Sequence, residues 1–116
     1  MMRVTTDLWV SALLRRVFSA GDFAAVIKRG AAEAGAVFVM TRDQFGELRL
    51  YGPAPQTSYS TAKPDDRQFT PVEDAVDEKS IDRHLERERR FDPDVWVVEI
   101  EAENDSVEEL ITITTP

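Results

Sequence analysis

The sequence predicts an α+β fold, with a mainly antiparallel sheet of four or five strands and two helices packed on one face of it. Three observations indicate this class. Apolar residues recur at helical spacing near the start, several short apolar runs are bounded by glycine and proline, and a charged helical segment precedes the last run. The 116 residues suit one domain, and we expect a single domain over residues 1–116.

The first helix is expected to be capped by Thr6 or Asp7. Gly21 is expected to end it, because glycine adopts a left-handed conformation without a Cβ clash. The apolar residues of this segment fall within about half of a helical wheel, so they are expected to face the core: Trp9, Val10, Leu13, Leu14, Val17 and Phe18.

Three strands are predicted next, at residues 23–29, 36–42 and 47–51. Their short connections favour an antiparallel meander. In the third strand Leu48 and Leu50 alternate with polar residues, so one face is expected to meet the core and the other water. The joint at residues 30–35 reads either as a loop, because glycines bracket it, or as a helical turn, because alanine dominates it.

The second half of the chain begins with a long irregular stretch, residues 52–66. Residues 70–73 have the layout of a capping box with proline at the first helical position, which predicts a helical start there. Because Ile81 and Leu85 project to another side than Val72 and Val76, we expect a turn and then a separate helix from about Glu78 to Arg90.

The last clear strand is predicted at residues 95–102, with Trp96, Val98 and Ile100 facing the core. The β-branched residues 110–115 are expected either to add an edge strand or to fray with the rest of the tail, residues 104–116.

The composition and charge of the chain exclude some classes of partner. The chain has no cysteine and carries a net charge of −8, with seven Lys/Arg against seventeen Asp/Glu in residues 51–116. Such a surface repels phosphate, so we expect no nucleic-acid partner, and no apolar run is long enough for a membrane span. The cytoplasm is the expected location, and the β-rich tail favours pairing of two copies into a homodimer.

Two candidate sites stand out. Tyr51, Pro53, Tyr59 and Arg67 flank or lie in the long loop together with Pro55, and exposed aromatic rings beside an arginine make a recognition patch. Packing of the loop on itself is the alternative explanation.

The second candidate is a set of carboxylates, Glu33, Asp92 and Asp94, which could ligate a divalent metal or act as acid and base if they converge. An ordinary helix-to-strand turn, in which Asp92 accepts backbone hydrogen bonds, is the preferred explanation of Asp92 and Asp94. His84 is the single histidine, and the sequence has no nucleophile elbow or phosphate-binding glycine loop. We therefore assign no cofactor, no metal site and no catalytic residue.

Four segments carry a resemblance: DLWV at 7–10, RGAAEAGA at 29–36, LYGPAPQ at 50–56 and FDPDVWVVEIE at 91–101. In this order and spacing the chain resembles an alphaproteobacterial family of uncharacterised proteins, domain of unknown function 1491. The resemblance implies a small single-domain bacterial protein, and it implies no activity, cofactor or catalytic residue. The chain departs from the family pattern at residues 72–79 and in its acidic tail.

The missing motifs and the proline-rich loop lead to the functional prediction of a non-catalytic binding or accessory domain. The alternative is a carboxylate-dependent enzyme, with or without a divalent metal, that uses Glu33, Asp92 and Asp94.

Overall fold

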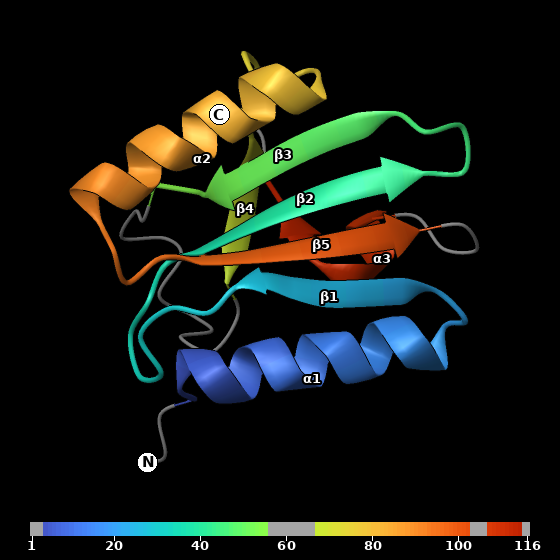
Figure 1. Cartoon of the computed structure of the whole chain (residues 1–116). Helices are drawn as coiled ribbons and strands as arrows, with labels where there is room; N and C mark the ends of the chain where they lie inside the picture. Colours follow the sequence, from blue (N-terminus) through green and yellow to red (C-terminus); the bar gives the residue numbers. More distant parts are fainter. Residues whose placement is uncertain (1–3, 56–66, 103–106, 115–116) are drawn as a thin grey trace.

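A six-stranded mixed sheet lies at the centre of the molecule in the computed structural model (Figure 1). The structure describes residues 4–55, 67–102 and 107–114. Within these ranges the elements are α1 (Thr6–Ser19), β1 (Phe23–Lys28), β2 (Val37–Asp43), β3 (Leu48–Pro53), β4 (Gln68–Pro71), α2 (Glu78–Phe91), β5 (Trp96–Ala102), α3 (Val107–Leu110) and β6 (Thr112–Ile113).

The strand order is β1-β5-β2-β3-β4-β6. β1 pairs with β5, β2 with β3 and β3 with β4 in antiparallel fashion, whereas β2–β5 and β4–β6 are parallel. The α+β class is therefore confirmed, and the expected antiparallel sheet of four or five strands is corrected to a mixed sheet of six. The central parallel pair needs a long crossover, and β3, β4 and α2 supply it.

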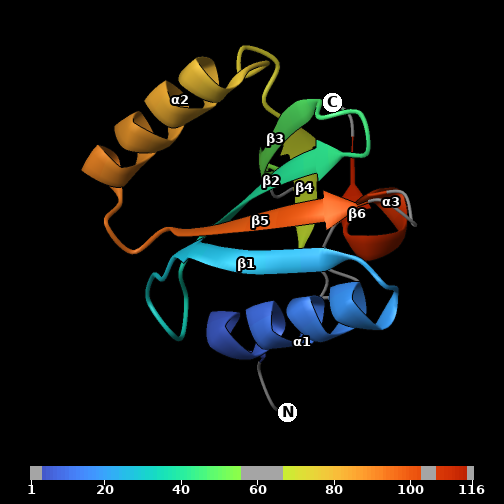
Figure 2. The same cartoon turned by 45° about the vertical axis from the view of Figure 1, so that its right-hand side comes forward.

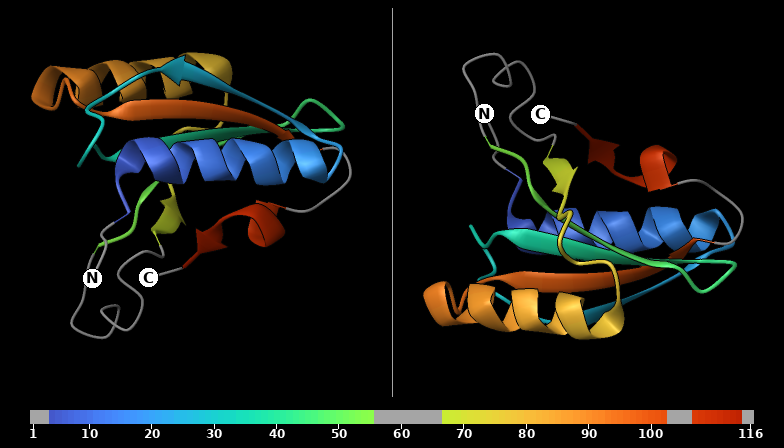
Figure 3. Two further views of the ribbon diagram at one scale, coloured as in Figure 1. Left: turned by 90° about the horizontal axis from the view of Figure 1, so that it is seen from below. Right: turned by 90° about the horizontal axis from the view of Figure 1, so that it is seen from above.

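The two long helices cover opposite faces of the sheet, not one face as expected (Figures 2 and 3). Val10, Leu13 and Val17 of α1 pack in one core cluster with Val39 and Trp96. A second cluster on the other face joins Ile81 of α2 to Phe38 and Leu50. The physical reason lies in β2 and β5, whose continuous apolar runs put side chains into both faces, because successive side chains of a strand alternate.

Helix α1 forms as the sequence predicts, although Thr5 is its N-cap. The Thr5 side chain accepts a hydrogen bond from Leu8 N–H at 3.3 Å. Gly21 follows the helix with φ 84°, the left-handed conformation expected of a terminating glycine. Phe18, which the wheel places in the core, is instead half exposed and meets Phe23 edge-on.

Helix α2 starts close to the predicted residue, but residues 70–73 do not begin a helix. Thr70 and Pro71 belong to β4, which pairs with β3 and buries Phe69 in the first cluster. The capping box lies further on, between Asp77 and Ser80. A strand is possible at Pro71 because its position opposite Tyr51 is the last of the β3–β4 ladder, where a missing N–H costs little.

The chain beyond β5 adds a third helix that the sequence reasoning missed. α3 brings Leu110 and Ile111 into the first core cluster, and β6 then pairs with β4. The expected edge strand is therefore present but short. Of the expected loop, Gly52 and Pro53 belong to β3, and residues 56–66 lie outside the described residues.

Candidate binding groove

The predicted recognition patch is only partly available to a partner. Tyr51 is 6% exposed because its ring lies in the first core cluster under the C-terminal segment. Burial raises the pKa of its hydroxyl. Pro53 and Pro55 are exposed, and Tyr59 lies outside the described residues. Binding by these residues stays a prediction, and Tyr51 cannot offer its ring as expected.

Arg67, the remaining member of the patch, lies against the start of α1. Its Nη2 donates to Thr6 Oγ1 at 2.6 Å and its Nη1 to Gly35 O at 3.3 Å. The guanidinium also lies 5.7 Å from the centre of the Trp9 ring. Partial burial lowers the pKa of Arg67 below its ordinary value. Arg67 therefore fastens the first helix to the 30–35 loop.

The three predicted carboxylate residues belong to turns and loops that make structural hydrogen bonds. Asp92 caps the end of α2 and its Oδ1 accepts a hydrogen bond from Asp94 N–H at 3.0 Å, so Asp92 makes the turn that the alternative explanation expects. Asp94 O accepts from Ala31 N–H at 2.9 Å, and Glu33 O accepts from Thr6 N–H at 3.3 Å. Among the described residues no three His, Cys, Asp or Glu side chains are placed to hold a metal ion.

Residues 30–35 form a loop with a turn at residues 32–34, and this loop packs directly on Trp96. The indole Nε1–H donates to Ala31 O at 2.8 Å. A Cβ on Gly30 would overlap Asp94 O, so only glycine fits this close approach. The segments at 7–10, 29–36 and 91–101 that carry the family resemblance thus meet around one buried tryptophan, which indicates a structural role for this end of the sheet.

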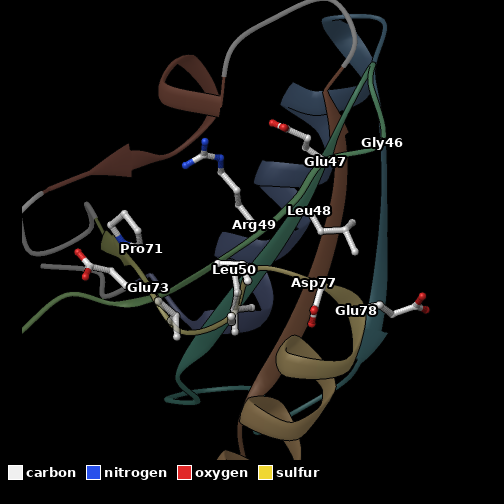
Figure 4. Close-up of a pocket in the computed structure, with 12 residues that line it drawn as sticks. Gly46, Glu47, Leu48, Arg49, Leu50, Pro71, Glu73, Asp77 and Glu78 are labelled. Atoms are coloured by element: carbon white, nitrogen blue, oxygen red, sulfur yellow. The ribbon is translucent and has the colours of Figure 1, made fainter.

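A groove of about 670 Å³ lies along the outer side of β3, where the chain crosses from β4 to α2 (Figure 4). Residues 46–50 form one wall, and residues 71–73 and 75–78 form the other. We call this the β3 groove. Its volume is in the range of ligand sites in proteins. Figure 4 shows Glu47 and Arg49 on one side of β3, and Leu48 with Asp77 on the other.

The floor of the β3 groove is apolar. Leu50 and Ala75 are buried at 1% and 3% exposure, and Leu48 and Val72 are half-buried beside them. Val76 is 70% exposed on the opposite wall. Apolar side chains at the bottom of an open groove give a ligand surface to bury.

The rim of the groove is acidic. Arg49 is the one cation among the lining residues. Exposed carboxylates lie on both walls, namely those of Glu47, Glu73, Asp77 and Glu78. The Ser80 side chain, and to a smaller extent the Ser80 backbone N–H, donate hydrogen bonds to Asp77 and hold the pKa of its carboxyl below the ordinary value. The groove therefore presents negative charge at neutral pH.

The backbone of β3 is unpaired where it lines the groove. Asp43 N–H donates to Glu47 O at 3.1 Å, which makes these residues a hydrogen-bonded pair. Hydrogen-bonded and non-hydrogen-bonded pairs alternate along an antiparallel ladder. The next pair, Arg42 and Leu48, is therefore not hydrogen-bonded, and the N–H and C=O of Leu48 point away from β2. The same alternation turns the backbone N–H and C=O of Leu50 away from β2, and this C=O accepts a hydrogen bond from Val72 N–H at 2.9 Å. Within the described ranges, the outward backbone groups of Leu48 have no such partner.

Sequence reasoning missed this groove. Its acidic residues were visible as part of the charged second half, and Leu48 and Leu50 were correctly placed toward the core. The signal that could have found it is Pro71 followed by a short acidic stretch, because proline ends strand pairing. That signal was read as the start of a helix.

The fold and the groove together define a small α+β protein with an acidic groove at a strand edge. The chain belongs to the DUF1491 family of proteins of unknown function, whose pattern matches residues 4–108, so the resemblance in the sequence is confirmed. No curated protein matches the chain.

Two solved structures illustrate the relationship. A solution structure of an A. tumefaciens protein is 47% identical, covers 99% of this chain and 98% of its own, and has a TM-score of 0.82. A crystal structure of a DUF1491 family protein from Caulobacter crescentus is 34% identical, covers 97% of this chain and 100% of its own, and has a TM-score of 0.78. Neither description states an activity.

Proposed function

We propose that this protein is a non-catalytic binding domain and that its ligand occupies the β3 groove. The supporting observation is the combination of an apolar floor and a carboxylate rim in a cavity of about 670 Å³. A ligand gains affinity from the floor and orientation from the rim, and neither requires a reacting group.

The β3 groove supports this proposal better than the predicted patch does, because Tyr51 is buried and Arg67 is engaged with Thr6 and Gly35. The carboxylate-dependent enzyme has no contact in its favour, since the backbones of Glu33 and Asp94 and the side chain of Asp92 make structural hydrogen bonds. The single histidine, His84, meets Phe38 and Glu88 on the inner side of α2.

The test is a fragment and peptide screen followed by chemical-shift mapping on the ¹⁵N-labelled chain. Ligands are expected to shift amides of residues 46–50 and 72–78 and leave residues 30–35 unchanged. Shifts that gather elsewhere contradict the proposed site. Turnover in a broad substrate screen that Asp92→Asn and Asp94→Asn abolish contradicts the non-catalytic role.

Two further parts of the proposal concern the setting. We expect the domain to work in the cytoplasm and to pair into a homodimer. None of the helices in the part of the chain that the structure describes is long and apolar enough to cross a membrane. Sedimentation velocity over a range of concentrations tests the dimer, and a single species with the mass of one chain at every concentration contradicts it.

A further inference from the structure

We infer that the β3 groove binds an extended protein segment rich in lysine or arginine, which adds to the sheet along the outer edge of β3. This inference rests on the proposed binding function and names the partner of the same groove. The observation behind it is the juxtaposition of an unpaired strand edge, an apolar floor and a carboxylate rim.

The strand edge is the first step. Leu48 turns its N–H and C=O into the groove, whereas two residues later Leu50 C=O is already bonded to Val72 N–H. β4 therefore covers only the second half of β3, and the chain leaves at Pro71 toward α2. An extended segment can continue the ladder that β4 abandons, because main-chain hydrogen bonds do not depend on the partner's sequence.

The apolar surface is the second step. Side chains of an added strand alternate, so every second residue would lie over Leu48 and against Val76, which is 70% exposed. Phe45, at the adjoining β2–β3 turn, is also exposed, at 82%. Exposed apolar residues beside an open strand edge are typical of an interaction site.

Charge decides the kind of segment. Four carboxylates and one arginine line the groove, so a segment with basic residues gains complementarity, whereas an acidic one meets repulsion. A second copy of this chain is a poor occupant because each copy carries −8. Nucleic acid is excluded at this surface by the same carboxylates.

The probe is an eight-residue peptide of alternating lysine and valine with blocked ends, added to the ¹⁵N-labelled full chain. The amide of Leu48 is expected to exchange with solvent rapidly in the chain alone. Exchange should slow about tenfold when the peptide is present at ten times its dissociation constant, because exchange then requires release. A peptide with glutamate in place of lysine, and one with every amide N-methylated, should not protect Leu48.

Charge-reversal variants separate the rim from general electrostatics. Glu47→Lys with Glu73→Lys is expected to weaken peptide binding at least about fivefold, since two attractive pairs become repulsive. The matched control is Asp82→Lys with Glu86→Lys, which makes the same charge change at exposed positions of α2 outside the groove and should weaken binding less than about twofold. Equal melting temperatures establish that both variants are folded.

The inference is overturned if the lysine peptide fails to protect Leu48, if the glutamate or N-methylated peptide binds as well, or if both double variants weaken binding equally. Protection of Leu48 that rises with the concentration of the chain alone would make a second copy the occupant and also overturn it. Other ligands that shift groove amides without protecting Leu48 would sink this inference and leave the proposed binding function intact.

Discussion

Gly30→Ala should be among the most damaging single-methyl additions in this chain, and the structure supplies a matched control for it. The added Cβ would overlap Asp94 O and lie 2.7 Å from Trp96 Cδ1, whereas real Cβ atoms stay beyond 3.0 Å from such neighbours. One clashing atom belongs to the backbone and the other to the fully buried indole. Neither can move without disturbing the core.

The cost follows from two effects. Overpacking of a close-packed site costs about 1–3 kcal/mol. The displaced loop also breaks the hydrogen bonds from Ala31 N–H to Asp94 O and from Trp96 Nε1–H to Ala31 O, and each of the two groups left unsatisfied costs about 1–3 kcal/mol. Together these lower the free energy of unfolding by at least about 3 kcal/mol out of a typical total of about 5–15 kcal/mol.

Gly46→Ala is the control because it adds the same methyl without a clash. Gly46 has φ +82° and nothing lies within 4 Å of the added Cβ, so its only cost is the left-handed conformation, about 1 kcal/mol. Gly30 has no such φ, so its cost is steric alone. The two variants therefore separate packing from backbone strain.

Calorimetry and urea unfolding of both variants make the measurement. At this chain length each kcal/mol lowers Tm by about 4 °C, so Gly46→Ala should melt about 4 °C lower and Gly30→Ala at least about 12 °C lower than the natural chain. If Gly30→Ala melts no lower than Gly46→Ala, the packing of the 30–35 loop on Trp96 is not as described.

Three further changes test other parts of the structure. Thr6→Val keeps the shape of a fully buried side chain but removes the hydrogen bonds that Oγ1 makes with Gly35 O and Arg67, so unfolding should become about 1–3 kcal/mol easier in urea; unchanged stability would refute that role. Ile81→Ala should cost about 2–5 kcal/mol and Ile81→Val only about 0.5–1.5, because Ile81 alone among α2 residues is fully buried; equal losses would contradict its position. Asp77→Ala should lower Tm at pH 7. Its folded pKa is depressed, so the stabilisation is present above the unfolded pKa and is lost as pH falls through the folded one; melting scans should show the two chains converging below about pH 4, and a constant gap would refute the cap.

Two predictions about the fold were wrong, one because tertiary contacts overrode a local pattern and one because a pattern was misinterpreted. Residues 70–73 match the sequence pattern of a capping box, but burial of Phe69 and pairing with β3 make Thr70 and Pro71 part of strand β4. At β2 and β5 the uninterrupted apolar runs carried the information that both faces are buried. The helices were nevertheless predicted on one face, because the strands were interpreted as having a single core side.

The sequence predicts which kinds of residue form the candidate sites, but it does not predict where in the fold these residues meet. The acidity of residues 51–116 is evident in the sequence, and three of the four carboxylates on the groove rim come from that half. What brings them to one edge is the departure of the chain from β3 at Pro71. The burial of Tyr51 has the same kind of reason, since its ring packs in one cluster with Leu110 and Ile111 of the folded C-terminal segment.

The sequence by itself determined the α+β class, both long helices, the positions of four of the strands and the inward side of β5, because these follow from local periodicity and local caps. Only the tertiary structure decided that β2 and β5 run parallel, that a helix covers each face, and that β3 keeps an open edge. Strand partners and faces depend on contacts between residues far apart in the chain, and no local pattern encodes which of several compatible partners a strand will meet.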